Sequence, residues 1–339
     1  MNILVTGGAG YIGSHTCIAL LKAGHDVIIA DNLSNSKRDT IKKIESISKK
    51  EVIFYEVDVS CEKSVNNIFS KHIIQGVIHF ASFKAIGESV QNPLEYYYNN
   101  VVSTMVLIKA CENFGVGKFV FSSSATVYGN NEVPFVESMN LLPTTNPYGE
   151  TKVMSERILI DVANSNPYLS VSILRYFNPV GAHESGLIGE SPNGVPNNLM
   201  PYITQVAKGK LKKLSVFGDD YSTIDGTGVR DYIHVLDLAD GHVAALENLI
   251  EGVHIYNLGT GKGTSVLELI KAFEEVNLVE VPYQICGRRP GDIDSCFADV
   301  SKVARELGWR AKRDLLSMCR DAWEFEKNNQ EICLNVSEE

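Results

Sequence analysis

The chain has 339 residues, of which 44% are hydrophobic and 21% are charged, so it is long enough to bury a large core without disulfide bonds. Its formal net charge of −10 argues against a general nucleic-acid or anionic-membrane binder, although it allows a local basic pocket for a phosphate. The seven cysteines form no C-x-x-C pair, which predicts free thiols in a cytoplasmic protein. The lack of a long apolar run predicts no membrane span, and a first strand starting at Asn2 or Ile3 predicts no signal peptide.

The first predicted strand, 2–6, leads into a glycine-rich turn and then into an amphipathic helix over 14–23. Residues 7–13 read GGAGYIG, and strand, glycine turn and helix in this order are the setting of a dinucleotide-binding fingerprint. Glycines let backbone N–H groups and a helix N-terminus approach a pyrophosphate. We therefore expect a dinucleotide to bind at this turn.

The second predicted strand, 26–30, ends at Asp31. A carboxylate at this strand end can accept hydrogen bonds from the adenosine ribose and would repel a 2′-phosphate, which favours NAD over NADP. The alternative is that Asp31 is an ordinary acidic loop residue.

Further strands alternate with helical stretches along the first half of the chain. They are predicted at 51–57, 76–80, 118–122 and 170–175. This alternation predicts a parallel sheet with right-handed crossovers, whose ligands lie at the carboxyl ends of the strands. We therefore predict an α/β fold, a Rossmann-type doubly wound parallel sheet with a smaller mixed α/β substrate domain.

Two features of this region carry polar side chains. The stretch 93–114 reads as one helix that contains Asn99 and Asn100, which either make the helix surface polar or donate a hydrogen bond into an active site. The sequence SSSATVYG at 122–129 follows a predicted strand, so its hydroxyls either form a turn or face the ligand edge of the sheet.

Tyr148 and Lys152 are four residues apart, which places them on one face of a helix. Asn146 as N-cap and Pro147 as first helical residue predict that this helix starts here and runs to about residue 164. A phenol needs roughly 4 kcal/mol to ionise near neutral pH, and one ammonium at about 4 Å supplies roughly that much at an effective dielectric near 20. Tyr148 is therefore a candidate base, and the alternative is a surface pair.

From about residue 176 the composition changes, because Gly, Pro and Asn become frequent and the alternation stops. We predict an NAD-binding domain over 1–176 onto which some later segments pack back, a substrate domain over 177–328 and a polar tail over 329–339. Two adjacent arginines, Arg288 and Arg289, suit bidentate phosphate contacts or a surface salt bridge. The acidic residues between 219 and 225 lack EF-hand spacing and the histidines lack ligand spacing, so no metal site is expected.

With these features together, the chain resembles the extended short-chain dehydrogenase/reductase superfamily, and within it the 4-epimerases that interconvert UDP-glucose and UDP-galactose. The resemblance covers nearly the whole chain. It is carried by TGGAGYIGSHT at 6–16, DNLSNS at 31–36, SSSATVYG at 122–129, RYFNPVGA at 175–182, NNLMP at 197–201 and GTGVRDYIH at 226–234, together with Tyr148 and Lys152.

The resemblance implies a set of site residues. Ser124, Tyr148 and Lys152 would be catalytic and would also contact NAD. The other NAD-binding residues would be Gly7, Gly10, Tyr11, Ile12, Gly13, Asp31, Asn32, Leu33, Ser34, Asn35, Ser36, Asp58, Val59, Phe80, Ala81, Lys84, Asn99 and Tyr176. The UDP-hexose would contact Asn178, Asn197, Asn198, Leu199, Ser215, Val216, Phe217, Arg230, Arg289, Asp292 and Cys296.

The implied reaction inverts C4 of the hexose through a 4-keto intermediate, because that carbon has no acidic proton. Tyr148 would take the C4 hydroxyl proton while the C4 hydride passes to tightly bound NAD, with Ser124 bonding the same oxygen and Lys152 stabilising the phenolate. Related dehydratases carry an Asp-Glu pair where this chain has Ala125 and Thr126, so we expect the ketone to be reduced back. The alternatives are another NAD-dependent nucleotide-sugar epimerase or dehydratase, and a non-catalytic NAD-binding protein.

Cys296 stands where relatives restricted to UDP-glucose and UDP-galactose carry a bulky Tyr. A small residue leaves room for a 2-acetamido group, so UDP-N-acetylglucosamine and UDP-N-acetylgalactosamine are predicted as further substrates. Relatives usually form homodimers through two paired helices from each subunit, which predicts the same assembly here. We expect neither nucleic acid nor a membrane as a partner.

Overall fold

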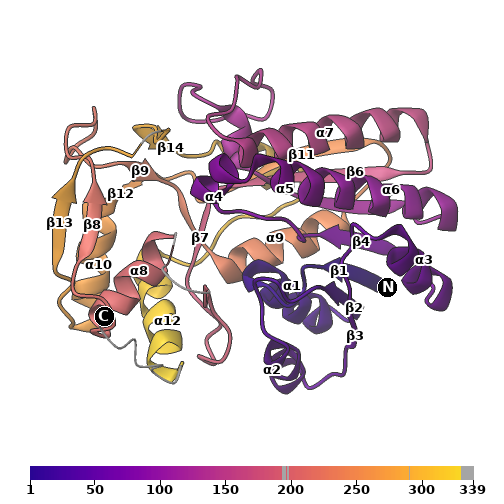
Figure 1. Ribbon diagram of the computed structural model, residues 1–339, viewed down its shortest axis with the longest axis horizontal. Helices are drawn as coiled ribbons and strands as arrows, with labels where there is room; N and C mark the ends of the chain where they lie inside the picture. The colour runs from indigo at the N-terminus through magenta and orange to yellow at the C-terminus, as the bar shows by residue number, and fades with distance from the viewer. Residues whose placement is uncertain (193–195, 197, 290, 330–339) are drawn as a thin grey trace.

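The computed structural model describes residues 1–192, 196, 198–289 and 291–329, and at its centre lies a seven-stranded parallel sheet (Figure 1). The strand order is β11-β6-β5-β4-β1-β2-β3, so the chain starts in the middle and winds outward in both directions. The strands are β1 (Asn2–Thr6), β2 (Asp26–Asp31), β3 (Ile53–Glu56), β4 (Gly76–His79), β5 (Lys118–Ser124), β6 (Ser170–Tyr176) and β11 (Val253–Leu258). The predicted Rossmann-type doubly wound sheet is confirmed.

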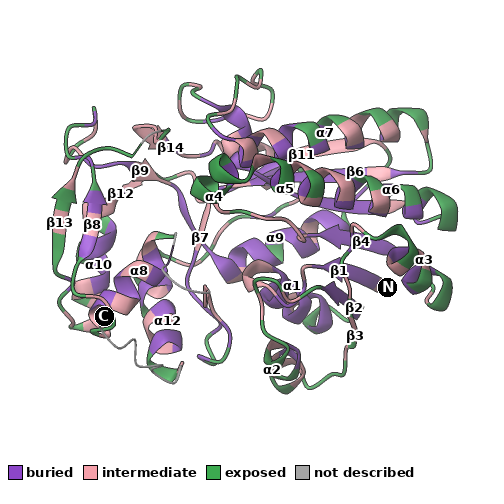
Figure 2. Cartoon of the chain, in the orientation of Figure 1, coloured by how far each residue is buried: buried purple, intermediate pink, exposed green. Residues whose placement is uncertain are grey.

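Helices cover both faces of the sheet, which is why its strands are apolar on both sides (Figures 1 and 2). On β1, Ile3 and Val5 pack in one core cluster while Leu4 packs in another, as the alternation of a strand requires. One face is covered by α1 (Tyr11–Lys22), α2 (Asp39–Ser48) and α9 (Val235–Glu247). The other is covered by α3 (Glu62–Lys71), α6 (Ser103–Phe114) and α7 (Pro147–Ser165).

The prediction of one continuous helix over 93–114 is wrong. The segment instead consists of α5 (Pro93–Tyr97), a π-helical turn η1 (Tyr98–Val102) and α6, and a short helix α4 (Ile86–Gln91) precedes it. The widened turn contains Asn100, whose side chain bonds inward to Phe83 and Thr151. Wide π turns often mark functional positions within helices.

The later part of the chain forms small sheets and helices beside the carboxyl ends of the central strands (Figure 1). The strand pairs are β7 (Asn178–Val180) with β10 (Tyr232–His234), and β8 (Leu214–Phe217) with β13 (Tyr283–Cys286); β9 (Val229–Arg230) pairs with β12 (Thr264–Ser265) and β14 (Ser295–Cys296). The helices are α8 (Leu199–Ala207), α10 (Val266–Asn277), α11 (Ser301–Glu306) and α12 (Leu315–Asn328). Helices α8, α10 and α12 bury a core cluster of their own with β7, β8 and β10, whereas Val303 of α11 packs in the core cluster of the central sheet.

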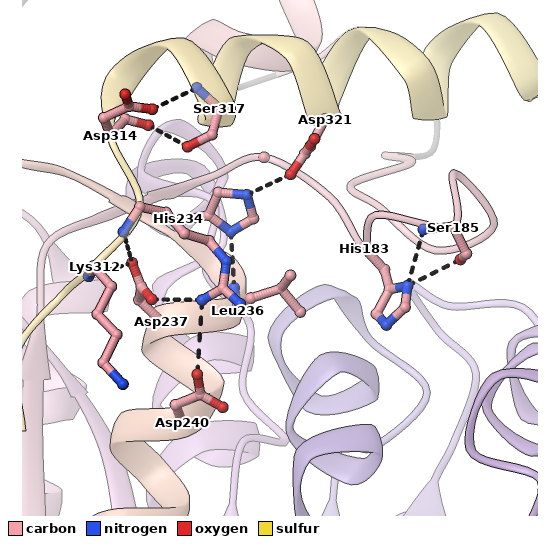
Figure 3. A network of polar contacts seen from close by, with 12 residues as sticks. His183, Ser185, His234, Leu236, Asp237, Asp240, Lys312, Asp314, Ser317 and Asp321 are labelled. Atoms are coloured by element: carbon pink, nitrogen blue, oxygen red, sulfur yellow. Dashed lines mark hydrogen bonds and ion pairs between the residues drawn. The ribbon is translucent and has the colours of Figure 1, made fainter. Parts of the chain in front are cut away.

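Polar contacts join α12 to α9, and so join the later part of the chain to the helical layer on the sheet (Figure 3). His234, the N-cap of α9, contacts Asp321 on α12 at 3.0 Å through Nε2 and accepts the Leu236 amide through Nδ1. Asp237 in the first turn of α9 accepts the Lys312 and Arg313 amides and pairs with the Arg313 guanidinium. Of the predicted tail, residues 330–339 lie outside the described residues.

Candidate active site

The serine turn lies at the carboxyl end of β5, where the chain leaves the sheet through a short 3-10 turn, η2 (Ala125–Tyr128). Ser124 is buried and is the N-cap of that turn. Its Oγ accepts hydrogen bonds from the Thr126 backbone N at 3.3 Å and from Thr126 Oγ1 at 3.0 Å. The predicted placement of Ser124 at the ligand edge of the sheet agrees with this position.

The helix that carries Tyr148 starts as its sequence predicts. Asn146 is the N-cap, its side-chain oxygen accepts the Gly149 amide at 2.9 Å, and Pro147 is the first helical residue. Tyr148 therefore lies in the first turn of α7, and its side chain is buried at 8% exposure rather than lying on a surface. The surface-pair alternative for Tyr148 and Lys152 is wrong.

Lys152 points from the next turn of α7 toward the end of β5. Its Nζ donates to the Ser122 carbonyl at 2.8 Å and lies 5.9 Å from the centroid of the Tyr148 ring. The Ser124 hydroxyl is close enough to the Tyr148 phenol to favour its ionised form. The structure therefore brings the three candidate catalytic residues together.

Burial acts against ionisation of both groups in this pair. Burial raises the pKa of Tyr148, and the neighbouring Ser124 hydroxyl opposes that rise. Burial also lowers the pKa of Lys152 to about 7, while the nearby Glu156 carboxylate opposes that fall. Our expectation from charge alone left out desolvation, which penalises an isolated phenolate and an isolated ammonium alike.

The depressed pKa of Lys152 predicts a pH-dependent stability difference. Between about 7, its folded pKa, and about 10.4, its unfolded pKa, the unfolded chain binds more protons at this site. Stability therefore rises with pH across this window, by up to about 1 kcal/mol per pH unit. Lys152→Met should show its best stability relative to the parent near pH 6 and lose that advantage toward pH 9.5, measured by urea unfolding.

The exposed Lys271 offers the matched control for this measurement, because its side chain is 77% accessible. Lys271→Met should differ from the parent by an amount that barely changes with pH. A pH-independent difference for Lys152→Met would show that burial does not hold down the pKa of Lys152.

The glycine turn is shaped for close approach of a ligand to the N-terminus of α1. A Cβ at Gly13 would lie 2.2 Å from the Gly7 carbonyl oxygen, and a Cβ at Gly7, whose φ is +69°, would lie 2.7 Å from the Ala81 backbone N. Within the described chain, no side chain caps the first turn of α1 and no acidic residue lies in it. These features fit a bound pyrophosphate, because its charge can meet backbone N–H groups and the positive end of the helix dipole.

Asp31 ties this turn to the loop that follows β2. One carboxylate oxygen accepts the Ala9 amide at 3.0 Å, and the other accepts the Leu33 amide and the Ser36 hydroxyl, both at 2.9 Å. Asp31 is buried at the predicted strand end, so it is more than a solvated loop acid. Its contact with an adenosine ribose stays a prediction, as do the roles of the loop residues Asn32, Leu33, Ser34, Asn35 and Ser36.

A histidine that the sequence did not single out supports the predicted cofactor residues beside the serine turn. His242 Nδ1 donates to the Leu238 carbonyl, and burial lowers the pKa of His242 to about 4, so its neutral Nε2 accepts the Ser122 hydroxyl at 3.0 Å. Its ring centroid lies 4.7 Å from that of Phe80 and 6.0 Å from that of Tyr176. His242 therefore fixes two predicted cofactor residues and the serine turn.

Glu190 is a second residue that sequence reasoning missed. Its Oε1 accepts Lys84 Nζ at 2.8 Å and Asn198 Nδ2 at 2.6 Å, so it joins a predicted cofactor residue to a predicted substrate residue. Asn198 is the N-cap of α8, directly before Leu199. Two other predicted cofactor residues make local hydrogen bonds. Asp58 Oδ1 accepts the Ser60 amide, and Asn99 Nδ2 donates to Oδ1 of its neighbour Asn100.

Several predicted UDP-contact residues cluster at the far end of the small sheets. Asp292 lies 3.9 Å from Arg230 and 3.3 Å from Arg289, whose guanidinium lies over the Phe217 ring at 4.6 Å. Cys296 on β14 lies opposite Arg230 on the neighbouring strand β9. The remaining predicted contacts are Asn178 on β7, Ser215 and Val216 on β8, and Asn197, which lies outside the described residues.

The two arginines of the Pro-Gly loop separate in the structure. Arg288 turns to Asp220, with Nε 2.7 Å from Oδ1. Arg289 pairs with Asp292, with Nε 3.3 Å from Oδ2, and lies over the Phe217 ring, so both arginines take part in salt bridges.

Comparison with known proteins identifies the family. The model of the NAD dependent epimerase/dehydratase family matches residues 3–259. The chain belongs to this family. It is 57% identical to UDP-glucose 4-epimerase of Bacillus subtilis (strain 168) over 331 residues, which cover 97% of this chain and 98% of the relative.

Two solved structures share the fold along the chain. UDP-glucose 4-epimerase from Bifidobacterium longum, in complex with NAD+ and UDP, has a TM-score of 0.95 at 52% identity and covers 97% of this chain and 99% of its own. The UDP-Glc/GlcNAc 4-epimerase from Campylobacter jejuni has a TM-score of 0.83 at 40% identity, with coverage of 97% and 99%.

The sequence motifs also leave out a buried ion pair that lies behind the serine turn. Arg175 on β6 binds both carboxylate oxygens of Glu156 on α7, and Ser123 donates to the same carboxylate. Tyr148, Lys152 and Glu156 are spaced by four residues, so the helical face that flags the first two also contains the third.

Two searches concern only the part of the chain that the structure describes. No helix there is long and apolar enough to cross a membrane. No group of three or more histidine, cysteine, aspartate or glutamate side chains there is placed to hold a metal ion.

Proposed function

We propose that the protein interconverts UDP-glucose and UDP-galactose by reversible oxidation at C4 of the hexose, with tightly bound NAD. The observation that carries this proposal is the convergence of Ser124, Tyr148 and Lys152 at the end of β5, beside the glycine turn of β1 and α1. The Bacillus subtilis relative that is 57% identical to this chain is named for the same reaction.

The residues of this chain move the C4 proton. Tyr148 takes it from the C4 hydroxyl, Ser124 holds the same oxygen by a hydrogen bond, and Lys152 balances the charge on the phenolate. The glycine turn and the N-terminus of α1 hold the cofactor, which supplies hydride acceptance and return when bound. Tyr148 returns the proton at the end, so the reaction needs no net proton exchange with solvent.

We expect the 4-ketone to be reduced back to an alcohol rather than to lose water. A dehydratase must eliminate water next to the ketone, which needs an acid and a base after the serine. Ala125 is a buried apolar residue, and the Thr126 hydroxyl is bonded to Ser124. This favours an epimerase over the alternative of a nucleotide-sugar dehydratase, and the buried catalytic group disfavours a non-catalytic NAD-binding protein.

Anchoring of the nucleotide falls to residues remote from the serine turn. Arg230 and Arg289 supply guanidinium groups suited to phosphate oxygens, and Phe217 presents an aromatic ring. A sugar held chiefly through its nucleotide can turn over and present its other face to the hydride. The test is to incubate the purified protein with UDP-galactose and detect UDP-glucose by NMR; no conversion would overturn the proposal.

We further propose that the 2-acetamido forms of these sugars are substrates. Cys296 is buried in an apolar cluster that includes Ala125 and Val127 of the serine turn and the aromatic rings of Phe135 and Phe177. The Campylobacter jejuni relative, 40% identical, is described as a UDP-Glc/GlcNAc 4-epimerase. A tyrosine in place of Cys296 would fill the space that an acetamido group needs.

Cys296→Tyr should lower kcat/KM for UDP-N-acetylglucosamine by about tenfold or more while leaving UDP-glucose conversion largely intact, because an oversized group in a fixed pocket is rejected at this scale. Cys296→Ser, which keeps the space, should retain both activities. Equal losses on both sugars in the tyrosine variant would contradict the proposed role of Cys296.

A homodimer in a reducing, cytoplasmic compartment completes the proposal. Apolar side chains lie exposed on neighbouring helices of one face: Val90 on α4, Leu94 on α5, Tyr98 in η1, Met105 on α6 and Met154 on α7. A second copy of the chain would cover this face, which agrees with assembly through paired helices. The six described cysteines are free thiols, which suits such a compartment. Sedimentation velocity tests the assembly.

A further inference from the structure

Asp231 lies in the GTGVRDYIH stretch at 226–234, and its carboxylate is fully buried. Oδ1 accepts the Thr260 amide at 2.8 Å and the Thr260 hydroxyl at 2.6 Å. Oδ2 accepts the Gly261 amide at 2.9 Å and the Ala298 amide at 3.2 Å. Burial raises the pKa of Asp231, and these four neutral donors oppose that rise.

The carboxylate joins two segments that lie far apart in the sequence. Loop 259–261 follows β11, the edge strand of the central sheet, and Ala298 comes two residues after Cys296 on β14. A Cβ at Gly259 would lie 2.5 Å from Oδ2, so this loop packs directly against the carboxylate. Asp231 therefore fixes the segment that carries Cys296 against the end of the sheet.

The backbone of Asp231 holds two predicted substrate residues. Its N–H donates to the Cys296 carbonyl at 2.9 Å, and its carbonyl accepts the Asn178 amide at 3.0 Å. Asn178 begins β7 and Cys296 ends β14, and we call these two residues the sugar wall. Because both are bonded to one residue, a displacement of Asp231 would move the sugar wall.

Arg230, the residue before Asp231, has anchors of its own. Its Nη1 donates to the Val229 carbonyl at 2.8 Å and to the Ile293 carbonyl at 2.9 Å. Neither bond involves the Asp231 carboxylate. Loss of that carboxylate should therefore displace the sugar wall and leave in place the guanidinium that is predicted to bind phosphate.

We propose that Asp231 is a positioning residue, whose carboxylate sets the sugar wall relative to the central sheet and so to the serine turn on β5. This inference rests on the proposed function, because that function makes Asn178 and Cys296 contacts of the sugar. Aspartate suits the role because an ionised carboxylate accepts at both oxygens. Asparagine has the same shape but accepts at one oxygen only, so one pair of donors would lose its acceptor.

Two substitutions of graded severity test the role of the carboxylate. Asp231→Asn keeps the side-chain shape and turns an NH2 group toward one pair of donors. Thr260→Val is milder, since it removes only the hydroxyl that donates to Oδ1, and Thr260→Ser keeps that hydroxyl. Asp161→Asn, at an exposed carboxylate on α7, is the control for the change from acid to amide.

Kinetics and UDP binding of the holoenzyme separate the sugar wall from the rest of the substrate site. Asp231→Asn should lower kcat for UDP-galactose about tenfold or more, because a displaced wall misplaces the sugar. Its Kd for UDP, measured by isothermal titration calorimetry, should stay close to that of the parent, because UDP has no hexose. Thr260→Val should lower kcat about three- to fivefold, whereas Thr260→Ser and Asp161→Asn should match the parent.

Alkylation of the native holoenzyme, read by peptide mass spectrometry, follows the sugar wall without any turnover. Cys296 is buried at 9% exposure and should react about fivefold faster or more in Asp231→Asn, because its strand opens more often. Cys319 on α12, which is buried at 0% exposure in the same part of the chain, should stay protected.

The proposal fails if Asp231→Asn keeps the kcat of the parent, if UDP affinity falls as much as kcat, or if Cys296 and Cys319 become reactive together. An equal loss in Thr260→Val and Thr260→Ser would also overturn it, and this pair decides alone if Asp231→Asn does not fold. If the parent does not convert UDP-galactose, the proposed function fails, and the alkylation rates still decide the role of Asp231.

Discussion

Tyr148→Phe is expected to lower kcat for UDP-galactose by about 10²- to 10⁴-fold, the range that a positioned general base contributes. The substitution removes one oxygen and leaves the ring, which is buried beside Lys152, in place. The fold and NAD binding should therefore survive, and the loss should appear in kcat with KM for UDP-galactose little changed. Stopped assays of UDP-glucose formation with matched NAD content measure it.

Tyr168→Phe is the matched control, because Tyr168 lies just beyond the end of α7 and is 88% exposed. Its kcat should equal that of the parent. An undiminished rate in Tyr148→Phe would refute the assigned base, even if the protein is an epimerase.

The sequence predicts those parts of the molecule that local rules determine. The β1 strand, the glycine turn and α1 follow from the apolar run and the glycine spacing, and the start of α7 follows from Asn146 and Pro147. Parallel strand order then places Ser124 and Tyr148 at one edge. Spacing makes Tyr148 a candidate base, and the resemblance adds the substrate and the reaction at C4.

Other features depend on contacts between distant segments. The seventh strand, β11, pairs with β6, although the segments are separated by the start of the small sheets. Glu190 and His242 occur in stretches without a motif, and their roles appear only when Lys84 and Ser122 are placed beside them. The pKa shifts of Tyr148 and Lys152 likewise depend on burial, which four-residue spacing does not reveal.

The ion pair of Glu156 and Arg175 joins α7, which carries Tyr148 and Lys152, to β6, the strand beside the serine-bearing β5. Glu156 is on α7, eight residues after Tyr148, and Arg175 is on β6, next to the serine turn on β5. Arg175 donates through Nε at 3.0 Å and Nη2 at 2.6 Å, and its guanidinium also lies 4.9 Å from the Tyr128 ring centroid. Relative displacement of α7 and β6 would break this pair. Because β6 is paired with β5, the ion pair also holds Tyr148 in place beside the serine turn.

Glu156→Gln should lower the free energy of unfolding by about 3–5 kcal/mol, because it leaves the Arg175 charge buried without a counter-ion. The two side chains are 1% and 4% exposed, so water cannot replace the lost partner. Urea unfolding followed by circular dichroism measures the loss. Asp161→Asn, an exposed carboxylate on the same helix, should change stability by less than about 0.5 kcal/mol.

A double variant separates the charge from the packing. Glu156→Met combined with Arg175→Met removes both charges at similar volume, and apolar replacements of buried pairs are often neutral or stabilising. The double variant should therefore be more stable than Glu156→Gln, but its kcat should stay below that of the parent, because α7 and β5 are no longer locked at Ser123. If the double variant were less stable than Glu156→Gln, the packing of these side chains rather than the unpaired charge would set the cost.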